Sequence, residues 1–127
     1  TSNICTNQGL LVTAATIYMS LMGDEGIRNI AAKCHGGMKK LLASATEIEG
    51  VSARFDQRFF HESVLELPKP ASDVVTLMAE QGVLGGYDLG LVDGRLKNCL
   101  LTNVTETKTD EDIELFVSTL RSVLEAK

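Results

Sequence analysis

The first 22 residues combine a polar start with a strongly apolar helical segment. Residues 1–8 are mostly polar, and the apolar residues behind them recur at steps of three and four, at Leu10, Ala14, Ile17 and Leu21. This spacing predicts a helix over residues 8–22 that stops at Gly23. Other apolar residues fill the positions between, so the helix is apolar on more than one side. A helix of that kind needs cover on most of its sides.

The next segment has the most regular pattern in the chain. Its apolar residues again recur at steps of three and four, at Ile27, Ile30, Ala31, Cys34, Met38, Leu41, Leu42 and Ala45. We therefore expect a second helix behind Gly23. Gly36 and Gly37 interrupt it, and each costs about 1 kcal/mol relative to alanine in a helix. Such a pair indicates close backbone packing or a bend.

From Gly50 the period of the pattern changes to two. This period predicts strands over residues 51–55 and 59–67, the second ended by Pro68 and Pro70. Ser72 is positioned to cap a short helix that closes at Gly82. The turn at residues 85–94 is rich in glycine, and Gly85 and Gly86 admit positive φ there. We expect Tyr87 to pack against the domain.

The last part of the chain reads as a strand over residues 98–104 and a helix capped by Thr109. The apolar stripe of this helix comprises Ile113, Phe116, Val117, Leu120, Val123 and Leu124. This order of elements predicts an α+β fold, a small and mostly antiparallel sheet with helices packed on one face. We expect residues 1–127 to form a single domain, entered by the helix at 8–22.

Composition narrows the class of protein. The chain has 127 residues, of which 44% are hydrophobic and 23% charged, and its net charge is -5. These values fit a soluble globular domain and disfavour nucleic acid or an anionic membrane as partner. Cys5, Cys34 and Cys99 are far apart and odd in number, so we expect reduced thiols in a cytoplasmic protein.

Three stretches resemble a known family. They are TSNICTNQGL with EGIRNIA at residues 1–10 and 25–31, GVLGGYDLG at 82–90, and NCLLTNVTETKTDEDIELFV at 98–117. They resemble the glycine cleavage system P-protein, glycine dehydrogenase (decarboxylating). Asn7-Gln8-Gly9 is similar to subunit 1 of the split bacterial form. The resemblance implies the C-terminal small domain of a fold type I pyridoxal-phosphate enzyme, with a large domain upstream.

The same resemblance implies an activity and its partners. The whole enzyme would decarboxylate glycine and pass the aminomethyl group to the lipoyl group of H-protein. Pyridoxal phosphate is expected on subunit 2, and none is expected on this chain, which would have a structural and interface role. The isolated chain should be inactive and should self-associate. Two alternatives stay open, the small domain of another such enzyme, for example an aminotransferase, and a free-standing α+β binding module.

The polar start supplies the candidate functional residues. Asn3, Thr6 and Asn7 can cap the first helix, or can line a subunit interface near the partner's cofactor pocket. We expect no catalytic, cofactor-binding or metal-binding residue in this chain. Three arginines could bind a substrate carboxylate, Arg54, Arg58 and Arg95. The simpler interpretation is that each is a solvated surface charge. The two histidines, His35 and His61, lack the convergent ligands of a zinc site.

Overall fold

A computed structural model describes residues 8–126, and it divides the chain into two units. The leading unit ends at Ala32, and the second unit, which begins at Lys33, contains the sheet. Helix α2 (Gly9–Ala45) begins in the first unit and ends in the second. Whether residues 1–127 act as one domain stays a prediction.

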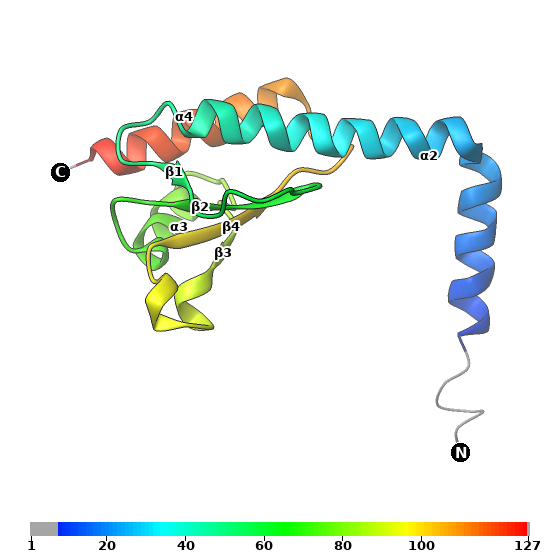
Figure 1. Cartoon of the computed structure of the whole chain (residues 1–127), viewed down its shortest axis with the longest axis horizontal. Helices are drawn as coiled ribbons and strands as arrows, with labels where there is room; N and C mark the ends of the chain where they lie inside the picture. The colour runs from blue at the N-terminus through cyan, green and yellow to red at the C-terminus, as the bar shows by residue number, and fades with distance from the viewer. Residues whose placement is uncertain (1–7, 127) are drawn as a thin grey trace, which may run out of the picture. The chain divides into compact units, whose positions relative to one another are not determined.

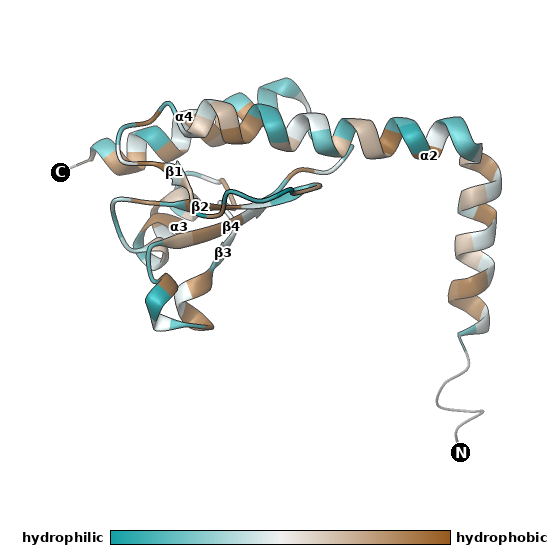
Figure 2. Cartoon of the chain, viewed as in Figure 1, coloured by the Kyte–Doolittle hydropathy of each residue, from teal (hydrophilic) through white to brown (hydrophobic). Residues whose placement is uncertain are grey.

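The leading unit is helical and apolar. Gly23 interrupts α2 with non-helical angles, φ 60° and ψ -174°, so the predicted break is confirmed. Three hydroxyls of the helix donate to the carbonyl oxygen four residues before them, those of Thr13, Thr16 and Ser20. The remaining side chains are mostly apolar, as the brown turns of residues 9–22 in Figure 2 show. Within residues 8–126, no helix is long and apolar enough to cross a membrane.

The second unit is an α+β fold, as the sequence predicts (Figure 1). Its helices are the end of α2, α3 (Ala71–Glu80) and α4 (Asp110–Glu125). Its strands are β1 (Ser52–Ala53), β2 (Glu62–Glu66), β3 (Tyr87–Asp88) and β4 (Cys99–Asn103). They form one sheet in the order β1-β2-β4-β3, and every neighbouring pair is antiparallel. Two 3₁₀ turns, η1 (Leu89–Leu91) and η2 (Gly94–Leu96), separate β3 from β4.

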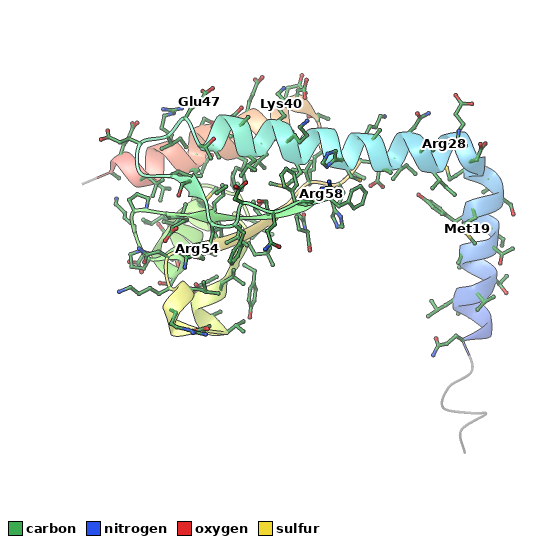
Figure 3. The ribbon with its side chains drawn as sticks, viewed as in Figure 1. Met19, Arg28, Lys40, Glu47, Arg54 and Arg58 are labelled. Carbon is green, nitrogen blue, oxygen red and sulfur yellow. The ribbon has the colours of Figure 1, made fainter. Side chains whose placement is uncertain are left out.

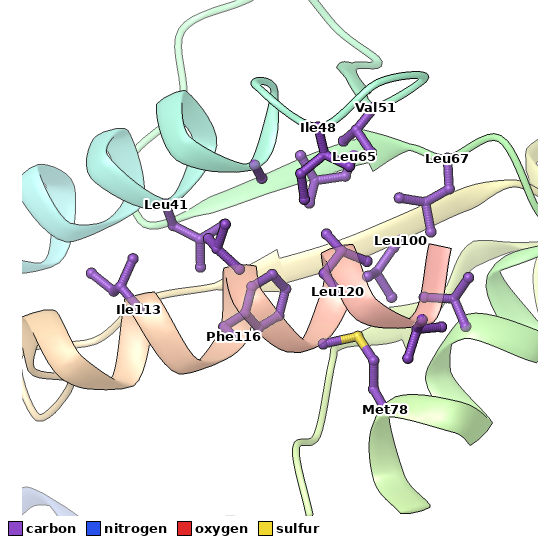
Figure 4. Close-up of a cluster of buried hydrophobic side chains, with 14 of the residues drawn as sticks. Leu41, Ile48, Val51, Leu65, Leu67, Met78, Leu100, Ile113, Phe116 and Leu120 are labelled. Carbon is purple, nitrogen blue, oxygen red and sulfur yellow. The ribbon is translucent and has the colours of Figure 1, made fainter. Parts of the chain in front are cut away.

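One face of this sheet carries the core (Figure 4). Leu65 of β2 lies opposite Leu100 of β4, and both side chains are fully buried. Leu41 of α2, Met78 of α3 and Leu120 of α4 belong to the same buried cluster. All three helices therefore supply residues to one core against one face of the sheet, as the predicted architecture requires.

Two of the predicted helix ends are confirmed. The Thr109 hydroxyl accepts from the Asp112 N–H at 3.2 Å, and the Asp112 carboxylate accepts from the Thr109 N–H at 2.9 Å, which completes a capping box for α4. Helix α3 closes at Gly82, which has a positive φ of 79°. The N–H groups of Gly82 and Val83 donate to Ala79 and Met78, the pattern of a Schellman motif.

Four local predictions are wrong. Ser72 caps nothing, since α3 begins one residue earlier behind Pro70 and the Ser72 hydroxyl donates to Asp73 instead. Both strands predicted before Pro68 are longer than β1 and β2, because only residues with a facing strand can form a ladder. The glycine-rich turn holds an unpredicted strand, β3, and only its second glycine, Gly86, has a positive φ. Tyr87 of that strand is 50% exposed rather than packed.

The Gly36-Gly37 pair is asymmetric. A Cβ built on Gly37 would lie 2.7 Å from Cγ1 of Val104, at the end of β4, whereas a Cβ on Gly36 would meet nothing within 4 Å. Close packing therefore explains Gly37. Nothing in the structure explains the glycine at position 36.

Candidate functional site: the α4 groove

The residues that the sequence singles out at the polar start, Asn3, Thr6 and Asn7, lie outside the described residues. Their expected place at a subunit interface stays a prediction. Within residues 8–126, the candidate site has to be found from the geometry of the second unit.

A hollow in this unit has a volume of about 710 Å³ and lies beside the first half of α4. We call it the α4 groove. Its apolar lining comes from α2, the loop between α3 and β3, β3 itself, β4 and α4, and comprises Leu41, Val83, Leu84, Tyr87, Leu101, Val104, Ile113, Leu115 and Phe116. Its polar lining comprises Glu62, Thr102, Asn103, Lys108 and Asp112.

The groove has a buried floor and an exposed apolar rim. Ile113 and Phe116 are core residues, whereas Leu84 is 90% exposed and Leu115 is 55% exposed. Tyr87 stands half-exposed beside them. Large apolar side chains that border a hollow are typical of surfaces that receive another protein segment. The groove can therefore accept apolar side chains of another protein segment.

Asp112, one of the polar residues that line the groove, lies in the first turn of α4. The Thr109 N–H that donates to the Asp112 carboxylate is the main cause that lowers the pKa of Asp112. The carboxylate stays charged at neutral pH and serves the helix cap. Asp112 is thus a structural group, and it has no partner arrangement of the kind that a general acid or base needs.

The three arginines considered from the sequence have different surroundings. Arg54 lies 3.1 Å from the Glu66 carboxylate across β1 and β2, and Arg95 lies 2.6 Å from Asp93. The Arg95 guanidinium lowers the pKa of Asp93. Arg58 makes no ion pair within residues 8–126, and Figure 3 shows it on the loop between β1 and β2, beneath α2. Of these three arginines, Arg58 is the one whose guanidinium has no carboxylate partner within residues 8–126, so it is free to bind an anionic ligand.

The described thiols and imidazoles do not form a reactive site. Cys34 and Cys99 are free and buried. Burial raises the pKa of each thiol, and the Glu106 carboxylate, 3.6 Å from the Cys34 sulfur, raises that of Cys34 further. A raised pKa keeps both thiols protonated and poorly nucleophilic. Within the described part of the chain, no three His, Cys, Asp or Glu side chains gather as a metal site.

Comparison with known proteins gives the family. Residues 1–120 match the glycine cleavage system P-protein family. The chain is 49% identical over 125 residues to a protein of Methylococcus capsulatus, and 49% identical over 126 residues to one of Nitrosomonas europaea. Both relatives are named "Probable glycine dehydrogenase (decarboxylating) subunit 1". These matches cover 98% and 99% of this chain and 28% of each relative, so the chain spans little more than a quarter of their length.

A solved structure gives the same result for the fold. The chain resembles the crystal structure of a glycine decarboxylase (P-protein) of the glycine cleavage system, in an inhibitor-bound form. The TM-score is 0.76 at 32% sequence identity, over 85% of this chain and 24% of that one. The similarity in sequence and the similarity in fold each cover most of the chain. This chain belongs to the glycine cleavage system P-protein family.

Proposed function

We propose that the chain is part of subunit 1 of a two-subunit glycine dehydrogenase (decarboxylating). The whole enzyme would decarboxylate glycine and transfer the aminomethyl group to the lipoyl group of H-protein, in the cytoplasm. The 49% identity to relatives that carry this subunit's name is the observation that supports the proposal best. Because the chain spans 28% of their length, a large domain would supply the rest of the subunit.

The P-protein family depends on pyridoxal phosphate. When bound, the cofactor stabilises the carbanion that decarboxylation of an amino acid leaves, and it needs a lysine beside its aldehyde. Two lysines within residues 8–126 are already engaged in other contacts. The Lys69 ammonium donates to the carbonyl oxygens of Val123 and Ala126 at 3.2 and 2.7 Å, and the Lys40 ammonium lies 2.9 Å from Asp110. Subunit 2 is therefore our candidate for the subunit that holds the cofactor.

These lysines have structural roles instead. Lys69 covers two carbonyl oxygens at the end of α4, where the helix dipole favours a cation. Lys40 ties α2 to the first turn of α4 through Asp110. Lys40 thus joins two helices, and Lys69 joins the loop before α3 to the end of α4, which agrees with a structural part for this chain.

The surfaces of the chain support an interface role. In the leading unit, Leu10 and Leu21 are 83% and 80% exposed. In the second unit, the α4 groove has Leu84 and Leu115 at its rim. Apolar surfaces of this kind are costly in water and are normally covered. We infer that the large domain, subunit 2 or both cover them in the whole enzyme.

A segment exchange tests the proposed function. This chain replaces the matching quarter of the Methylococcus capsulatus subunit 1, and the chimaera is produced together with subunit 2 of that organism. Release of labelled carbon dioxide from carboxyl-labelled glycine is then measured with pyridoxal phosphate and lipoylated H-protein. We expect the chimaera to assemble with subunit 2 and to release carbon dioxide.

A matched control shows whether the exchange itself is tolerated. The control chimaera carries the corresponding segment of the Nitrosomonas europaea relative, which is as similar to this chain as the recipient is. An active control beside a soluble but inactive chimaera of this chain would contradict the proposal. Lysate from cells without subunit 2 provides the background rate.

A further inference from the structure

A second hollow of about 510 Å³ lies between α2 and the loop that joins β1 to β2. We call it the basic corner. Its lining comprises His35, Lys39, Asp56, Gln57, Arg58 and Phe59. All of these residues belong to the second unit, and none of them takes part in the α4 groove.

His35 connects the two segments that line the basic corner, α2 and the loop between β1 and β2. Its Nδ1 lies 3.0 Å from the carbonyl oxygen of Phe60. A carbonyl oxygen only accepts, so this hydrogen bond places the proton on Nδ1. The imidazole also contacts two aromatic rings. Its centroid is 5.6 Å from that of Phe59, in a tilted arrangement, and 6.4 Å from that of Phe60, in a stacked one. These contacts join α2 to the loop that carries Arg58.

Lys39 and Arg58, the two cations of the basic corner, form no ion pair within residues 8–126. Arg28, Lys40, Arg54 and Arg95 each lie within 3.1 Å of a carboxylate oxygen. Lys39 and Arg58 have no such partner among residues 8–126, although Asp56 lines the same hollow. In a chain with a net charge of -5, this hollow is lined by two cations and one carboxylate, a local excess of one positive charge.

The chemistry of these side chains selects the ligand. A guanidinium offers a planar fork of donors that suits two oxygens of one group, and an ammonium adds a compact charge beside it. We propose that the basic corner binds an oxyanion, a phosphate or a carboxylate group, through Arg58 and Lys39. The carboxylate of Asp56 opposes a bare anion, so it favours a ligand that also carries a hydrogen-bond donor. The open hollow leaves room for the rest of that molecule.

Equilibrium dialysis tests the site on the full 127-residue chain. One arm uses labelled inorganic phosphate, and the other uses labelled succinate, with sodium chloride holding the ionic strength constant. Dialysis measures bound anion whatever the oligomeric state of the chain. Binding of phosphate alone or of succinate alone supports the site and identifies its preferred group. No binding in either arm in the millimolar range would overturn the proposal.

Charge-matched variants locate the binding. Lys39→Gln and Arg58→Gln should each weaken binding about fivefold, as expected for one contact at an exposed site, and the double variant should lose it. The control variant, Lys97→Gln with Arg121→Gln, removes one lysine and one arginine that line neither hollow. Equal affinities of the two double variants would show general charge attraction and overturn the site. Far-UV circular dichroism verifies that each variant is folded.

Discussion

Alanine at position 37 should be more harmful than alanine at position 36, although both replace glycine in α2. Either substitution gains about 1 kcal/mol of helix propensity. At position 37 the new methyl would also lie 2.7 Å from Cγ1 of Val104, a side chain that is 2% exposed. Valine is stiff at χ1 and has no room to turn away, so this overpacking should cost about 1–3 kcal/mol.

The difference between the two variants isolates the packing cost, because propensity is common to both. We expect Gly36→Ala to raise the free energy of unfolding by up to about 1 kcal/mol. Gly37→Ala should lie about 1–3 kcal/mol below Gly36→Ala. Urea unfolding followed by far-UV circular dichroism measures both, at one low protein concentration. Equal stabilities would refute the close approach of α2 to the end of β4.

A double variant tests whether Val104 is the obstacle. Val104→Ala removes Cγ1, so it should cost less in the Gly37→Ala background than in the wild type. The same substitution beside Gly36→Ala is the control, because Gly36 has no neighbour there. An identical cost of Val104→Ala in all backgrounds would assign the effect of Gly37→Ala to another cause.

Four further predictions concern the core, the cap of α4 and the surface of the leading unit. Phe116→Ala should destabilise the chain by about 3 kcal/mol in urea unfolding, because Phe116 is buried in the core and is only 8% exposed, and a loss below about 1 kcal/mol would show that α4 is peripheral. Thr109→Ala should cost about 1 kcal/mol by removing the capping box. The Thr109 N–H lowers the pKa of Asp112 in the folded chain. The charged carboxylate therefore stabilises the fold above its unfolded pKa, and this contribution disappears as pH falls through the lower folded pKa. Asp112→Asn should thus destabilise the chain at pH 7 but not in strong acid. The chain should self-associate in light scattering, and Val12→Glu or Met19→Glu should weaken this association without unfolding; a monomer at high concentration contradicts it.

Local signals explain what the sequence predicts well. The cap of α4 needs only Thr109 and a carboxylate three residues later, and the stop of α3 needs only Gly82. The break at Gly23 is local as well. Each of these features is decided within a few residues of the chain. Pattern and propensity are enough to place them.

Features that depend on residues far apart in the chain are harder to predict from the sequence. The length of β2 is set by its pairing with β4, more than 30 residues away, and the pattern around it is equally apolar outside the ladder. Strand β3 is defined by its pairing with β4, and a Cβ at Gly86 would meet the carbonyl oxygen of Leu101, a distant contact that no local pattern predicts. The two hollows require the same long-range information. His35 and Arg58 are 23 positions apart and show no relation in the sequence, and the hydrogen bond of His35 to Phe60 brings α2 and the loop of Arg58 to one place.

The uncovered surfaces of the chain differ in character, and salt should separate them. The side chains of residues 9–22 and the rim of the α4 groove are apolar, so their association with other surfaces depends on burial from water. Sulfate and other salts that are excluded from protein surfaces strengthen such burial. Binding at the basic corner depends on exposed charges, which are screened within about 8 Å at physiological ionic strength. Rising salt should therefore increase self-association while it decreases anion binding. A parallel loss of both would mean that the chain associates through its charges, and the inference that a missing apolar partner covers residues 9–22 would be wrong.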